Sequence, residues 1–169
     1  QINSLLWSFA AIFICLILIW KSLKLSCLTL ITNAIPILFL FALLVFTDNA
    51  LNSINVMIAP IILGIVIDDS IHFISYFRSL RGTGKTNEQA LNLTFRQKVN
   101  PILCTSLILA TTMALFTLAP FPPIQSFGLF GALAILGGLI TTLVLLPCLL
   151  RKIDNQARPI KEIHDELSK

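Results

Sequence analysis

The sequence predicts an all-α membrane protein, a bundle of five transmembrane helices with a short amphipathic linker helix on the cytoplasmic side. Of its 169 residues, 56% are hydrophobic and 12% are charged, and the mean hydropathy is +0.90. That composition is too apolar for a soluble domain. The apolar residues also gather in runs long enough to cross a bilayer. The expected spans are residues 5–20, 25–46, 54–77, 101–118 and 124–150.

The distribution of basic residues sets the orientation of these spans. The first and third connections and the segment after the fifth span contain Lys or Arg, whereas the second and fourth connections contain neither. By the positive-inside rule, the N-terminus then lies outside and the C-terminus in the cytoplasm. Residues 1–152 form the transmembrane domain, and residues 153–169 form a polar cytoplasmic tail. Because the basic residues lie beside hydrophobic segments, the net charge of +4 does not indicate a nucleic-acid partner.

The longest connection, residues 79–100, predicts the linker helix. A turn at Gly82 and Gly84 comes first, and Thr86 with Gln89 then fits a capping box, in which each side chain satisfies an amide of the first helical turn. Gly84, Lys85 and Thr86 match the end of a phosphate-binding P-loop, but Ser79 stands where that motif requires Gly. ATP binding is therefore not expected.

Two adjacent acids, Asp68 and Asp69, interrupt the third span. At about 1.5 Å of rise per residue they lie close to the midplane of a hydrocarbon layer of ~30 Å. A carboxylate at that depth costs at least ~2.5 kcal/mol, so membrane aspartates usually face a protein interior and serve ions or protons. We expect the pair to titrate together as a proton relay, with the primary acid left open. A structural buried hydrogen bond is the alternative.

Other polar residues are candidates to support the relay. His72 follows the aspartates by one helical turn, although a hydrogen bond to a neighbouring helix would also explain it. In the fourth span, Thr105 and Thr112 share a helical face and Ser106 adjoins Thr105. These hydroxyls either exchange hydrogen bonds with the aspartates or bond back to their own backbone.

Small residues in the fifth span, among them Gly128 and Gly131, predict close approach of neighbouring helices. The four cysteines show no CxxC or Cys/His spacing typical of a metal site, and they fit small buried hydrophobes. That spacing gives no reason to expect a metal. We also expect no cofactor and no enzymatic activity.

The third span contains the run Gly64-Ile-Val-Ile-Asp68-Asp69-Ser-Ile-His72-Phe73. This run, with the basic connection and the hydroxyl-bearing span after it, resembles the aspartate-bearing helix of the resistance-nodulation-division (RND) superfamily, most closely its MMPL and Patched-like exporters. The resemblance implies that the five spans are the last five helices of one half of a two-half transporter. The short polar tail favours the C-terminal half, and the N-terminal half stays open. The sterol-sensing domain is the same unit.

The resemblance also implies roles for individual residues. Asp68 and Asp69 are then proton-relay candidates, and Gly64 is a close-packing position. Since many relatives have Asp-Tyr at the aspartate pair, the resemblance leaves open which acid is primary. The first apolar run follows Gln1 directly, without a charged leader segment, so we expect a piece of a longer protein.

The expected function is the transmembrane part of a proton-motive-force-driven exporter of hydrophobic or lipid-like substrates, in the bacterial inner membrane. Its expected partners are protons, membrane lipids, the substrate, and the other half and extracytoplasmic domain of the parent chain, and an oligomer is allowed. The alternative is a sterol-sensing-like regulatory module that binds lipid without transport. An intramembrane aspartyl protease is disfavoured, since it needs aspartates on two helices and both acids here share one.

Overall fold

The computed structural model describes the backbone of residues 2–47 and 53–154, and the side chains of residues 7–47 and 57–152. The described chain is helical almost throughout. Its helices are α1 (Ile2–Trp20), α2 (Leu23–Phe46), α3 (Ser53–Gly82), α4 (Asn87–Leu115), α5 (Pro122–Ile140) and α6 (Leu146–Asp154). A 3₁₀ turn, η1 (Phe116–Leu118), follows α4, and a π-helical turn, η2 (Thr141–Leu145), joins α5 to α6. Residues 155–169 of the predicted tail lie outside the described residues.

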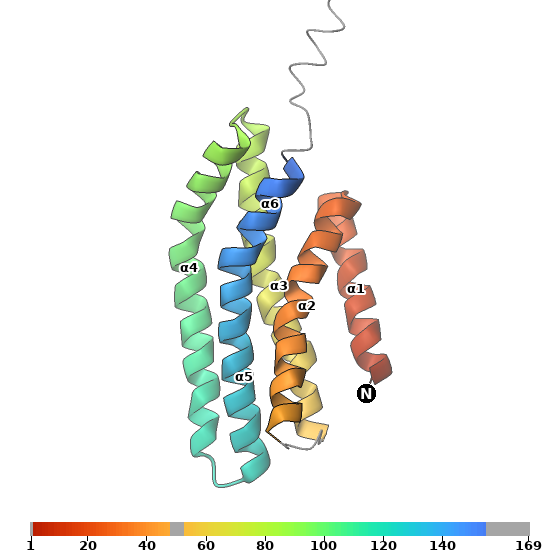
Figure 1. Cartoon of the computed structure of the whole chain (residues 1–169), viewed down its shortest axis with the longest axis vertical. Coiled ribbons are helices and arrows are strands. Elements are labelled where there is room, and N and C mark those ends of the chain that lie inside the picture. Colours follow the sequence, from red (N-terminus) through yellow and green to blue (C-terminus); the bar gives the residue numbers. More distant parts are fainter. Residues whose placement is uncertain (1, 48–52, 155–169) are drawn as a thin grey trace, which may run out of the picture.

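The helices form an elongated bundle (Figure 1). Four segments are long and apolar enough to cross a membrane, namely Leu23–Phe46, Met57–Gly82, Asn87–Leu118 and Pro122–Lys152, and Trp7–Trp20 is a shorter apolar helix. Helix α5 packs against α2, α3 and α4, while α1 lies at the edge of the bundle against α2. The predicted all-α membrane bundle is confirmed.

The linker helix begins where the sequence predicts it, but it is not a separate element. Thr86 caps the helix, and the capping box with Gln89 is formed in both directions. Gly84, in the turn before it, has a φ of +81°, which suits glycine. The helix then continues through Pro101 into the fourth span. Because residues 87–100 contain many good helix formers, the backbone bonds on both sides of Pro101 outweigh the one it removes.

Two glycines of α5 bring neighbouring helices into close contact. A methyl group at Gly128 would lie 2.6 Å from the Met113 carbonyl oxygen of α4, and one at Gly138 would overlap Val66 of α3. Gly131 lies beside the Met113 sulfur, 3.4 Å from where its Cβ would stand. Gly64 differs, since no described atom lies within 4 Å of its Cβ position. Within the described chain, Gly64 is therefore not a close-packing position.

Candidate functional site

Three consecutive residues at the middle of α3 point in three directions. Successive helical residues are about 100° apart, so Asp68, Asp69 and Ser70 cannot share a neighbour. Asp69 reaches a side chain of α4, Ser70 reaches one of α2, and Asp68 turns away from the bundle. The apolar residues before them, Ile62, Leu63 and Val66, are buried and hold α3 in this rotation. The site thus consists of polar side chains at the middle of α3, together with the residues of α2 and α4 that two of them contact.

Asp69 is joined to α4 by a hydrogen bond. The Ser106 hydroxyl donates to Asp69 Oδ2 at 3.1 Å. Ser106 is buried, and Asp69 is half-buried. A hydroxyl can donate to a carboxylate and can also accept from a carboxylic acid. This contact therefore suits both protonation states of Asp69, with the direction of the hydrogen bond reversed between them.

Ser70 is joined to α2 in a similar way. Its hydroxyl donates to Asn33 Oδ1 at 3.0 Å, and both residues are fully buried. The Asn33 Nδ2 atom is buried without a hydrogen-bond partner in the described part of the protein. Neither residue was predicted as part of the site. The available signal was an asparagine in an otherwise apolar span, since such a group needs a partner inside the bundle.

Asp68 and His72 lie on an outward polar stripe of α3. His72 Nε2 is 3.7 Å from Asp68 Oδ1, and the two side chains are 65% and 72% exposed, respectively. Gly64 and Ser75 lie on the same exposed face, at spacings of four and three residues. The sequence places this stripe at membrane depth, where a charged side chain facing lipid is costly. The stripe is thus a polar surface that the described helices leave uncovered.

The two threonines predicted to support the relay do not reach the aspartates. The Thr105 hydroxyl donates to the Pro101 carbonyl at 3.1 Å, and the Thr112 hydroxyl donates to the Ile108 carbonyl at 2.8 Å. Both side chains are exposed on the outer face of α4. Hydroxyls in membrane helices commonly bond back to the preceding turn in this way. Of the three hydroxyl candidates on α4, the structure brings only Ser106 to an acid.

Residues 2–47 and 53–154 hold no group of three or more His, Cys, Asp or Glu side chains that could bind a metal ion. The chemistry that the described site offers is proton binding at a carboxyl group that contacts a hydroxyl on the next span.

Comparison with known protein families assigns the chain. The model of the MMPL family matches residues 4–165, which include most of α1 and all of α2 to α6, with the aspartate-bearing α3 among them. The chain belongs to the MMPL family. The predicted RND resemblance is thereby confirmed, and MMPL membership indicates an RND-type transporter or a sterol-sensing-like module in a membrane. No curated protein and no solved structure matches the chain.

Proposed function

We propose that this MMPL chain is the transmembrane part of a proton-motive-force-driven exporter of hydrophobic or lipid-like substrates. Asp69 is the primary proton carrier, and Asp68 is the second acid of the relay. The observation that carries the proposal is the hydrogen bond from Ser106 to Asp69, because it links an acid near the bilayer midplane to a second span. The proposal includes no enzymatic step.

Protonation of Asp69 is the event that moves the helices. A carboxylate only accepts hydrogen bonds, whereas a carboxylic acid also donates one, so protonation changes the contact between α3 and α4. One proton crossing a potential of 100 mV releases about 2.3 kcal/mol. That energy changes the ratio of two conformations roughly 50-fold. A relay at this contact therefore has enough free energy to bias a two-state movement.

In the proposal, the rest of the parent protein packs against the outward polar stripe of α3. Asp68 and His72 are too exposed and too polar to face lipid. In the proposal, the other half of the transporter covers this stripe and supplies the opposite wall of the proton path. The basic connections lie in the cytoplasm, as the charge distribution indicates.

Proton flux through the full-length parent protein in liposomes tests the proposal. A pH gradient is imposed, and the wild type is compared with Asp69→Asn, Asp68→Asn and Glu88→Gln at equal protein levels. Glu88 is the matched control, since it is an exposed acid at the start of α4 whose partner is Arg151, 2.9 Å away. We expect flux to be lost in Asp69→Asn, reduced in Asp68→Asn and unchanged in Glu88→Gln.

Undiminished flux in Asp69→Asn would overturn the assignment of the primary acid. A wild type that conducts no protons, yet binds lipid equally at all pH values, would instead indicate the sterol-sensing-like module. The two outcomes are separable because the first concerns one residue and the second concerns the whole relay.

A further inference from the structure

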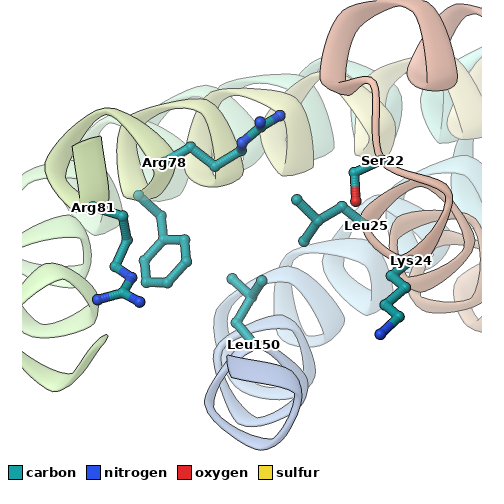
Figure 2. A pocket seen from close by; sticks show the side chains of 7 residues that line it. Ser22, Lys24, Leu25, Arg78, Arg81 and Leu150 are labelled. Atoms are coloured by element: carbon teal, nitrogen blue, oxygen red, sulfur yellow. The ribbon is translucent and has the colours of Figure 1, made fainter. Parts of the chain in front are cut away.

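A pocket of about 280 Å³ opens at the end of the bundle where α2 begins and α3 ends (Figure 2). Ser22, Lys24 and Leu25 contribute from the start of α2, Phe77, Arg78 and Arg81 from the end of α3, and Leu150 from α6. The volume is near the lower limit for small-molecule sites, so the pocket suits a headgroup rather than a whole lipid.

The pocket combines an apolar floor with a basic rim. Phe77 and Leu150 are buried, and Leu25 is half-buried beside them. Lys24, Arg78 and Arg81 supply three positive charges, and no acidic residue is among its described lining. The rim therefore attracts an anion, while the floor accepts apolar groups attached to it.

Backbone contacts hold the two arginines in place. Arg78 Nη1 donates to the Trp20 carbonyl oxygen at 2.8 Å, and Arg81 Nη1 donates to the Lys85 carbonyl oxygen at 2.8 Å. The start of α2, at its N-cap Ser22, adds the positive end of a helix dipole to the same rim. The two guanidinium groups therefore point to different sides of the pocket, where their charges make the rim positive (Figure 2).

The height of the pocket matches the lipid phosphates. Arg78 is nine residues from Asp69, which places it ~13 Å along the helix from the midplane acids, near the edge of a ~30 Å hydrocarbon layer. Basic pockets between transmembrane helices at this height bind anionic lipid headgroups.

We propose that this pocket binds the phosphate of an anionic phospholipid, with Lys24, Arg78 and Arg81 attracting the phosphate from the rim and the first acyl carbons of the lipid over Phe77 and Leu150. The bound lipid braces the end of α3 against α2 and α6. This site requires only that the chain spans a membrane, so it does not depend on the proposed proton relay.

Lipid binding by the full-length protein tests the proposal. The protein is placed in phosphatidylcholine nanodiscs, and phosphatidylglycerol is added at increasing mole fraction while bound lipid is counted by native mass spectrometry. The double variant Lys24→Gln/Arg81→Gln is compared with Arg96→Gln/Lys152→Gln, which removes the same charge from exposed residues outside the pocket. We expect the pocket variant to lose affinity roughly 30-fold, and the control variant to lose less than about threefold.

Equal losses in the two double variants would overturn the pocket as the site. Thermal unfolding of both variants shows whether they fold. If the pocket double variant does not fold, Lys24→Gln alone is the second test, because it changes an exposed side chain. We expect the single variant to bind about fivefold more weakly. Glycerol 1-phosphate is added as a soluble competitor. If it binds in the pocket as tightly as the lipid, the site recognises a free phosphate ester and the lipid assignment is wrong.

Discussion

The contact between Gly138 of α5 and Val66 of α3 allows a sharp test of the packing. A methyl group at Gly138 would overlap Val66 Cγ2 and lie 3.0 Å from Cγ1 and 3.3 Å from Cβ. Val66 is 2% exposed, so its branched side chain has little space to move away. Overpacking of this kind costs about 1–3 kcal/mol. The better helix propensity of alanine returns about 1 kcal/mol. We expect Gly138→Ala to destabilise the protein by up to about 2 kcal/mol.

The neighbouring glycine is the matched control. A methyl group at Gly137 would meet Phe39 Cδ1 at 3.6 Å and Pro36 Cβ at 3.9 Å, which are ordinary van der Waals distances. Gly137→Ala should therefore gain up to about 1 kcal/mol from helix propensity. Thermal unfolding in detergent measures both variants. A loss of about 2 kcal/mol lowers the midpoint by roughly 4–8 °C in a chain of this size.

A double variant isolates the pair. Val66→Ala removes the atoms that a methyl group at Gly138 would overlap, so Val66→Ala/Gly138→Ala should be more stable than the sum of the single changes, by at least about 1 kcal/mol. If Gly138→Ala is as stable as Gly137→Ala, or if the double variant shows no coupling, α3 and α5 do not pack as described and the argument is refuted.

Three further predictions concern the hydrogen bonds of the bundle. Ser106→Ala removes the donor to Asp69, and because a hydrogen bond to a charged group contributes about 1.5–3 kcal/mol, proton flux in liposomes should fall at least about tenfold. Thr111→Val, which removes a hydroxyl bonded only to its own helix, should leave flux unchanged, and equal effects of the two would contradict the prediction. Ser70→Ala leaves a buried amide oxygen of α2 without its donor, so thermal unfolding should show a loss of about 1–3 kcal/mol, and no loss would contradict that bond. Thr86→Ala should cost about 1 kcal/mol and speed amide hydrogen exchange in the first turn of α4, whereas unchanged exchange would show that the cap is not used.

Hydropathy predicts the helices well because a bilayer leaves few alternatives. Apolar runs of this length must satisfy their backbone groups internally, which only helices or closed barrels achieve. The capping box at Thr86 was equally clear, since its two side chains lie three residues apart in the sequence. The continuity of α4 was not predicted, because Pro101 usually ends a helix. Here the segments on both sides of Pro101 are helical, and α4 continues through the proline.

The partners within the site were harder to predict than its acids. The depth of Asp69 follows from counting residues, but the choice between Ser106 and Thr105 depends on how α4 is rotated about its own axis. Outer and inner faces of a membrane helix are both apolar, so periodicity gives little information about that rotation. The rotation comes instead from close packing at Gly128, whose neighbour across the contact is the backbone carbonyl of Met113 on α4. In the sequence, the only sign of that contact was the small side chain of Gly128.

Packing and hydrogen bonding together restrict how α3 can respond to a proton. Val66 presses against Gly138 one turn before the acids, so α3 cannot move closer to α5. Ser70, next to Asp69, is tied to α2 through a fully buried bond. The bond to Ser106 is the one contact among these that changes character when Asp69 gains a proton, because only there is a titrating group involved. In the proposed mechanism, protonation therefore acts on the interface between α3 and α4, while α2 and α5 serve as the fixed support.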